Sequence, residues 1–174
     1  MSTPANPLSA KLLVGTFMQD KDSFYGVSTQ LEEQLGKIDI ISPWFDFDYT
    51  DYYEKEMGKD LYRRIIVFKD LIDQENLAKI KINTNLLENR YKNNQCRKIN
   101  IDPGYMLPSR FILATGKDYS HRIYIGNGIY ADLTLIFKNG DFHTLDWTYP
   151  DYAARDMRDF LLKVRRKYLL DLAL

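Results

Sequence analysis

Residues 121–144 read HRIYIGNGIYADLTLIFKNGDFHT, and this stretch carries the clearest structural pattern of the chain. Two turns, at Gly126-Asn127-Gly128 and at Asn139-Gly140, separate three runs in which apolar and polar residues alternate. Asn-Gly between alternating runs is a strong hairpin signal, and a two-residue turn at Asn139-Gly140 sets Phe137 opposite Phe142. The stretch therefore predicts a three-stranded antiparallel meander.

The first of these turns allows two registers. A two-residue loop mixes polar with apolar side chains on each face of the hairpin. A three-residue loop keeps the faces distinct, because Tyr124 then pairs with Tyr130. The same register places Arg122 opposite Asp132. We therefore predict the three-residue loop, a left-handed backbone at Gly128 and a cross-strand ion pair.

The chain before residue 121 alternates strand and helix patterns. Strand-type runs occupy residues 11–18, 38–49, 63–72 and 98–102, and helical apolar spacing occupies residues 24–35 and 77–91. Pro43 makes the second run an edge or bulged strand. Pro103-Gly104 ends the fourth run, which makes Asp102 a turn residue. The resulting βαββαβ order permits a ferredoxin-like sheet with both helices on one face.

The end of the chain has the spacing of a long amphipathic helix. From Asp151 onward, apolar residues recur at helical intervals, namely Ala154, Met157, Phe160, Leu161, Val164, Tyr168 and Leu172. This closing helix must dock on the sheet or on a partner. We therefore predict a single α+β domain over residues 1–174. It has a loose arm at residues 1–10 and a ferredoxin-like βαββαβ unit extended by the meander and the closing helix.

Charge and cysteine content exclude several classes of protein. The 174 residues carry 24 basic and 24 acidic side chains, so the overall field that attracts bulk nucleic acid is absent. Cys96 is the only cysteine, which excludes an internal disulfide and a cysteine-clustered zinc or iron–sulfur site. The sequence contains neither an apolar run of about 20 residues nor a signal peptide, so we expect a cytoplasmic location and no membrane partner.

Four blocks of the sequence carry a family resemblance. They are DYTDYYEKEMG at residues 48–58, NIDPGY at 100–105, KDYSHRIY at 117–124 and WTYPDY at 147–152. Through these blocks the chain resembles domain of unknown function family 4416, a group of bacterial and archaeal proteins. The resemblance implies no established chemistry. Some members carry the label GTP-binding protein, which implies a nucleotide ligand.

No standard phosphate-binding motif accompanies that label. A P-loop needs G-x-x-x-x-G-K-[ST], and no stretch of the chain fits it. Residues 126–131 match the dinucleotide fingerprint G-x-G-x-x-A, but the period-two alternation that follows predicts a hairpin turn instead of a helix. A nucleotide would therefore need a site of another kind, and the sequence identifies no cofactor.

The richest polar segment, KDYSHR at residues 117–122, enters the meander. Lys117 and Arg122 suit the phosphate of an anionic or phosphorylated small ligand, of which a nucleotide is one. The further ligand-binding candidates are Asp102, Asp132 and Tyr149, the last because aromatic side chains at 147–152 could stack on a base or sugar. A binding module is the function that we favour from the sequence.

A metal-assisted phosphoesterase or nuclease is the first alternative. In it, Asp102, Asp118 and Asp132 supply oxygen ligands to a divalent metal, and His121 or Asp118 is the catalytic acid or base. The predicted register instead sets His121 opposite Leu133 on an apolar face, which favours a packed wall histidine. The second alternative is a non-catalytic oligomeric or adaptor protein that uses the closing helix.

A second polar segment, residues 46–56, is acidic and aromatic. Its carboxylates are Asp46, Asp48, Asp51, Glu54 and Glu56. Strand alternation sets the first two on one face, ~7 Å apart, where they could share a hard cation. A solvated strand face is the interpretation that we favour.

Overall fold

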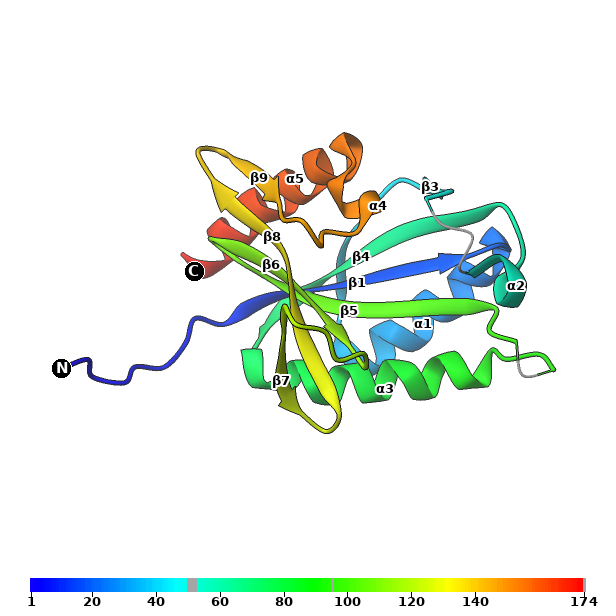
Figure 1. Ribbon diagram of the computed structural model, residues 1–174, viewed down its shortest axis with the longest axis horizontal. Coiled ribbons are helices and arrows are strands. Elements are labelled where there is room, and N and C mark those ends of the chain that lie inside the picture. The colour runs from blue at the N-terminus through cyan, green and yellow to red at the C-terminus, as the bar shows by residue number, and fades with distance from the viewer. Residues whose placement is uncertain (50–52, 95, 174) are drawn as a thin grey trace.

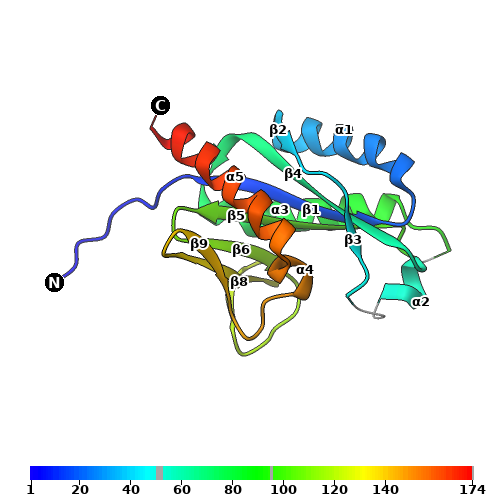
Figure 2. The same cartoon turned by 90° about the horizontal axis from the view of Figure 1, so that it is seen from above.

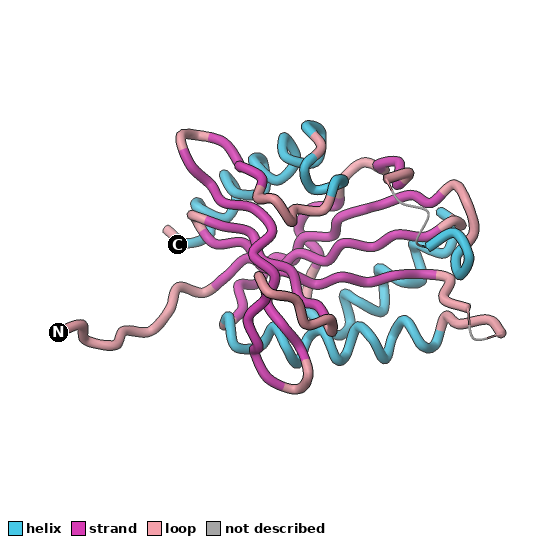
Figure 3. Tube along the Cα trace, in the orientation of Figure 1, coloured by secondary structure: helices cyan, strands magenta, loops and turns pink. Residues whose placement is uncertain are grey.

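The computed structural model describes residues 1–49, 53–94 and 96–173. Within them, nine strands form one antiparallel sheet with helices on both faces (Figure 1; Figure 3 gives the element types). The strands are β1 (Ala10–Met18), β2 (Ile38–Ile41), β3 (Phe45–Phe47), β4 (Leu61–Ile72), β5 (Ile99–Leu107), β6 (Arg110–Thr115), β7 (Arg122–Gly126), β8 (Ile129–Lys138) and β9 (Asp141–Thr144). The helices are α1 (Phe24–Leu35), α2 (Glu54–Met57), α3 (Leu77–Arg90), α4 (Pro150–Ala153) and α5 (Arg155–Leu172). Residues 1–9 precede β1 and extend away from the sheet (Figure 1).

The sheet has the strand order β2-β4-β1-β5-β6-β8-β7, with β1 between β4 and β5. Every residue of β1 is buried, as expected of a largely apolar central strand. Leu12 and Val14 pack against α1 and α3, whereas Leu13 packs beneath α5. One face of the sheet is therefore covered by α1 and α3 and the other by α5 (Figure 1 and Figure 2).

The second predicted strand is interrupted at Pro43. On either side of it, β2 and β3 pair with β4. Proline has no backbone N–H to give to a ladder, so the chain leaves the sheet there. The hydroxyl of Ser42 accepts the N–H of Ile65 at 2.9 Å and so replaces a ladder bond. The predicted edge character of this segment is confirmed.

The fourth strand is longer than predicted. β5 continues through Asp102, Pro103 and Gly104, so the predicted turn at these residues is wrong. Pro103 pairs with β1, and β6, which the sequence pattern missed, begins to pair only at Gly104. A Cβ on Gly104 would lie 2.4 Å from the carbonyl oxygen of Ile112, so glycine is required for this close approach. Asp102 is a strand residue that pairs with Gly15.

The predicted register of the β7–β8 hairpin is confirmed at Arg122, which pairs with Asp132. The predicted left-handed backbone at Gly128 is confirmed, but the loop is one residue shorter than predicted. Asn127 and Gly128, with φ of 54° and 73°, form a two-residue turn, and the pairing shifts by one residue within residues 124–126. A bulge therefore supplies the extra residue that the sequence pattern placed in the loop.

The second hairpin has the predicted pairing of Phe137 with Phe142, and both Asn139 and Gly140 have positive φ. The three strands do not form a simple meander with β8 in the middle. β6 pairs with one edge of β8, so β7 and β9 follow one another along the other edge. The sequence pattern did not predict this arrangement, because it did not indicate β6, the strand that occupies one edge of β8.

The closing helix is broken near its start. Ala154, with an extended ψ of 144°, separates α4 from α5. The predicted apolar stripe of α5 packs on the sheet through Met157, Phe160, Leu161, Val164 and Tyr168. None of the helices in the described part of the chain combines the length and the apolar composition that a membrane span requires.

Candidate functional site

A cavity of about 870 Å³ opens where β5 and β6 separate. β6 pairs with β5 only from Gly104 onward, so Asn100 and Asp102 lie on a strand edge that no other described strand covers. The end of β6, the loop that follows it and the start of α4 provide further walls. The cavity is thus a consequence of the sheet topology, because two neighbouring strands stay paired over only part of their length.

Charged and aromatic side chains dominate the described lining of this cavity. Its cations are Arg63, Lys81, Arg97, Lys117 and Arg122. Its carboxylates are Glu88, Asp102 and Asp151. Its aromatic side chains are Phe47, Tyr49, Tyr53, Tyr119, Trp147, Tyr149 and Tyr152. Cations therefore outnumber carboxylates, and ring surfaces are abundant.

Arg63 of β4 is a buried cation in the cavity wall, with 4% of its side chain exposed. Its Nε lies 2.8 Å from Oδ2 of Asp151, and its Nη1 donates to the hydroxyl of Tyr152 at 3.1 Å. The rings of Phe17 and Phe47 lie 5.1 Å and 4.8 Å from the guanidinium carbon. Aromatic faces and one carboxylate together make burial of this charge tolerable.

Gly15 of β1 provides the space for this cation. A Cβ at position 15 would lie 2.7 Å from the hydroxyl oxygen of Tyr152 and 2.9 Å from Nη1 of Arg63. Both atoms belong to side chains that are almost fully buried. A side chain at this position would therefore displace Arg63 or Tyr152.

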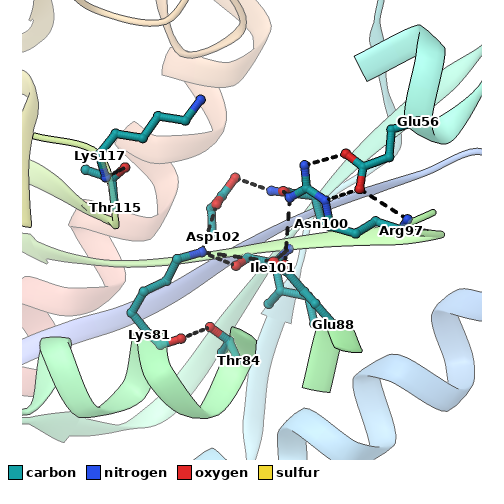
Figure 4. A network of polar contacts seen from close by, with 10 residues as sticks. All are labelled: Glu56, Lys81, Thr84, Glu88, Arg97, Asn100, Ile101, Asp102, Thr115 and Lys117. Atoms are coloured by element: carbon teal, nitrogen blue, oxygen red, sulfur yellow. Dashed lines mark hydrogen bonds and ion pairs between the residues drawn. The ribbon is translucent and has the colours of Figure 1, made fainter. Parts of the chain in front are cut away.

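The open edge of β5 carries a polar network (Figure 4). Lys81 Nζ donates to the carbonyl oxygen of Ile101 at 2.8 Å and to Oδ1 of Asp102 at 3.2 Å. The side-chain amide of Asn100 donates to Oδ2 of Asp102 at 2.5 Å. Glu88 accepts the N–H of Ile101 at 2.6 Å, and burial raises the pKa of Glu88 although the charge of Lys81 opposes this. Both carboxylate oxygens of Asp102 are therefore engaged by protein donors.

A bidentate pair joins α2 to the start of β5. Arg97 donates from Nε to Oε1 of Glu56 at 2.8 Å and from Nη2 to Oε2 at 2.7 Å. Its Nη1 donates to Oδ1 of Asn100 at 2.8 Å. The hydrogen bonds from Arg97 hold the pKa of Glu56 below its ordinary value of 4.5.

Arg122 organises the wall formed by β7 and β8. Its Nε donates to Oδ2 of Asp132 at 2.9 Å, and its Nη1 donates to the carbonyl oxygen of Lys117 at 3.0 Å. Its Nη2 donates to the hydroxyl of Tyr149 at 2.7 Å. Burial raises the pKa of Tyr149 to about 12, although the charge of Arg122 opposes the rise. Each guanidinium nitrogen of Arg122 thus already has a protein acceptor.

His121 packs in the same wall, but not on the apolar face that the sequence register predicted. Its ring stacks on Trp147, with ring centres 4.8 Å apart, and its Nε2 lies 3.3 Å from Oδ2 of Asp132. The indole N–H of Trp147 donates to the carbonyl oxygen of Leu133 at 2.8 Å. Leu133 therefore contacts this wall through its backbone, and the ring of His121 stacks on Trp147 and, at 6.2 Å between ring centres, on Tyr119.

The predicted site residues divide into two groups. Those that line the cavity are Asp102, Lys117, His121, Arg122 and Tyr149. Asp132 and Asp118 are not part of the cavity lining. Asp132 forms an ion pair with Arg122, and the carboxylate of Asp118 accepts a hydrogen bond from Tyr130. Among the described residues, no group of three or more His, Cys, Asp or Glu side chains could hold a metal ion. The three carboxylates of the metal hypothesis therefore form no such group in this part of the chain.

The acidic segment at residues 46–56 does not form a cluster of carboxylates among its described members. Asp46 and Asp48 are exposed, as expected of a solvated strand face. Glu56 is held by Arg97, and Asp51 lies outside the described residues.

Sequence reasoning missed Arg63, Asp151 and Tyr152. One signal was available, because Arg63 alternates with Ile65 and Val67 on the buried face of a central strand. A charged side chain at such a position requires a partner, since an unpaired buried charge is strongly unfavourable. Asp151 had no equivalent signal, because an acidic residue after Pro150 also suits the first turn of any helix.

The fold and the cavity define a class of protein, an α+β domain whose antiparallel sheet opens at a strand edge into a charged, aromatic-lined cavity. A family model described as Domain of unknown function (DUF4416) matches residues 8–168. The chain belongs to this family, which confirms the resemblance seen in the four sequence blocks. No curated protein and no solved structure matches the chain.

Proposed function

We propose that this protein binds a phosphorylated small molecule with a planar ring, of which a nucleotide is the representative, in the cavity between β5 and β6. The observation that carries the proposal is the lining, in which five cations and seven aromatic side chains of the described residues surround about 870 Å³. This volume lies in the range of roughly 300–1,000 Å³ that is typical of small-ligand pockets. Cations suit a phosphate, and aromatic faces suit a base.

Trp147 supports the part of the proposal that concerns the ring. Its side chain is held by the hydrogen bond to the Leu133 carbonyl and by stacking on His121, yet 38% of the residue stays exposed. A fixed ring with an exposed surface is suited to stacking on a base. Lys117, in the loop that follows β6, lines the same cavity and supports the part that concerns the phosphate (Figure 4).

The two alternatives from the sequence have less support. A metal-assisted phosphoesterase needs free carboxylates, and those of Asp102 are engaged by Lys81 and Asn100. An adaptor that uses the closing helix needs an unoccupied apolar stripe, and the stripe of α5 is buried against the sheet. Binding is therefore the function that the described geometry favours.

The two tryptophans allow a direct test. Trp44 packs near Phe24 on the sheet face that carries α1 and α3, whereas Trp147 lines the cavity. The variant W44F keeps Trp147 as the only fluorescent indole, and the matched variant W147F keeps Trp44. Both are titrated with nucleoside mono-, di- and triphosphates of the four bases, with the nucleosides and with ribose 5-phosphate.

We expect a saturable fluorescence change for at least one phosphorylated ring compound in W44F and no change in W147F. A preference for guanine compounds would support the GTP-binding label that some family members carry. The proposal is wrong if no compound of the panel changes the fluorescence of W44F, or if nucleosides and nucleotides bind equally well.

We also propose that the N-terminal part of the sheet is a ferredoxin-like βαββαβ unit. The spatial order β2-β4-β1-β5 and the position of α1 and α3 on one face support this assignment. The strands β6 to β9 and the helix α5 then extend the unit and supply one side of the cavity.

A further inference from the structure

We propose that Arg63 is the phosphate-binding residue of this cavity, a role that rests on the proposed binding function. Its guanidinium donates hydrogen bonds in its own plane to the oxygens of one phosphate group of the ligand. An arginine fork matches a phosphate in this way, with more geometric specificity than an ammonium group. The assignment follows from the acceptors that each cation of the cavity already has.

Arg63 has more donors than its protein partners use. A guanidinium carries five N–H donors. Nη1 donates to the Tyr152 hydroxyl, while Nη2 hydrogen-bonds none of the described residues, although Arg63 lines the cavity. The rings of Phe17 and Phe47 beside the guanidinium offer no lone pair in its plane. Donor capacity therefore remains on a cation that is 4% exposed, and a ligand oxyanion would supply the acceptors.

The contact between Arg63 and Asp151 is itself incomplete. Nε and Oδ2 lie 2.8 Å apart, yet neither atom makes a hydrogen bond of acceptable geometry with the described residues. Burial raises the pKa of the Asp151 carboxyl, although the charge of Arg63 opposes the rise. The two groups attract each other without the directed hydrogen bonds that normally satisfy a buried ion pair. A phosphate beside Arg63 completes the bonding of the guanidinium.

Three of the other cations of the cavity, unlike Arg63, already donate their hydrogen bonds to protein acceptors. All three guanidinium nitrogens of Arg122 donate to protein oxygens, and so do all three of Arg97. Lys81 donates to a backbone carbonyl and to a carboxylate. Lys117, the fifth cation, is therefore tested beside Arg63.

The test uses the double variant R63M/D151N, which removes both buried charges and so leaves neither of them unpaired. The matched control R155M/D159N removes an Arg–Asp pair on α5 whose side chains are 90% and 59% exposed. Isothermal titration calorimetry measures the affinity of each protein for a nucleoside 5′-monophosphate and for the matching nucleoside. Near-ultraviolet circular dichroism checks that each variant is folded.

We expect the wild type and the control to bind the monophosphate about 10- to 100-fold more tightly than the nucleoside. R63M/D151N should bind both compounds equally and keep the nucleoside affinity of the wild type. A preference that survives in R63M/D151N overturns the proposal, as does a wild type without any preference. Loss of the preference in K117M but not in R63M/D151N assigns the phosphate to Lys117 and also overturns it.

The variant R63K keeps the test decisive if R63M/D151N does not fold. It retains the charge beside Asp151 but has no fork, so we expect the preference for the monophosphate to fall about tenfold. An unchanged preference in R63K, with the fold intact, contradicts the assignment of bidentate binding to Arg63.

Inorganic phosphate separates the failure of this inference from the failure of the proposed function. If no nucleotide binds the wild type, phosphate binding is followed by ³¹P nuclear magnetic resonance. Binding to the wild type and R155M/D159N but not to R63M/D151N supports the role of Arg63 while the nucleotide proposal fails. Absence of phosphate binding to the wild type overturns the role of Arg63. Equally strong binding of acetate assigns the site to carboxylates and overturns the phosphate assignment.

Discussion

Arg122 and Asp132 lie opposite each other in β7 and β8, with Nε 2.9 Å from Oδ2, and their side chains are only 5% and 1% exposed. The same arginine holds Tyr149, and the same carboxylate lies beside His121. A buried pair of this kind adds little net stability, but loss of one partner leaves the other charge uncompensated. The pair therefore fixes the position of one cavity wall.

The substitution Asp132→Asn should lower the free energy of unfolding by about 3 kcal/mol, because it leaves Arg122 buried without its counter-charge. Urea denaturation at pH 7 measures the change. Asp159→Asn is the matched control, since Asp159 belongs to an exposed pair and should change stability by less than about 0.5 kcal/mol. If the two substitutions lowered the free energy of unfolding equally, burial of the Arg122–Asp132 pair would not make the loss of its carboxylate more costly.

The substitution Gly15→Ala should destabilise the protein by about 1–3 kcal/mol and weaken ligand binding, because the new Cβ collides with Tyr152 and Arg63. Thermal unfolding and the W44F fluorescence titration measure the two effects. Gly116→Ala is the control within the same cavity lining, since its Cβ would meet no atom within 4 Å. A Gly15→Ala protein as stable as Gly116→Ala would contradict the predicted crowding.

The Glu56–Arg97 pair should give a pH-dependent contribution to stability. The pKa of Glu56 is lowered in the folded state. The stabilisation from the ionised Glu56 is therefore fully present above pH 4.5, and it is lost as the pH falls through the lowered pKa. We expect Glu56→Gln to be less stable than the wild type by about 1 kcal/mol at pH 7. The difference should shrink as the pH falls below 4.5. Urea denaturation from pH 7 to pH 3 tests this, and Glu33→Gln on the exposed side of α1 is the control.

Tyr149 should ionise late in an alkaline titration. Burial raises its pKa to about 12, so the folded state loses stability relative to the unfolded chain as the pH rises from about 10 to about 12. The difference in absorbance at 295 nm between the wild type and Tyr149→Phe should have its midpoint near 12. The same pair of proteins in concentrated urea should give a midpoint near 10. A midpoint near 10 in the folded protein would contradict the predicted rise in the pKa of Tyr149.

Local patterns predicted the elements whose interactions are close in the chain. The turn at Asn139-Gly140 and the pairing of Arg122 with Asp132 were predictable, because the backbone preference of Asn-Gly and the faces of a hairpin are decided within a few residues. The full length of β5 was not predictable from local patterns, because Pro103-Gly104 has the sequence of a turn. Its place in the sheet depends on β1 and β6, which pair with it from elsewhere in the chain.

The sequence by itself determined the alternation of strands and helices, the register of the hairpins, the apolar stripe of α5 and the family. Only the tertiary structure decided that Asp102, Lys117 and Arg122 border one cavity and that Arg63 belongs to it. Arg122 and Asp132 are 10 positions apart, whereas Arg63 and Tyr152 meet across 89. Periodicity describes which face a residue occupies, but the partner across such a distance is chosen by packing, space and charge in the folded chain.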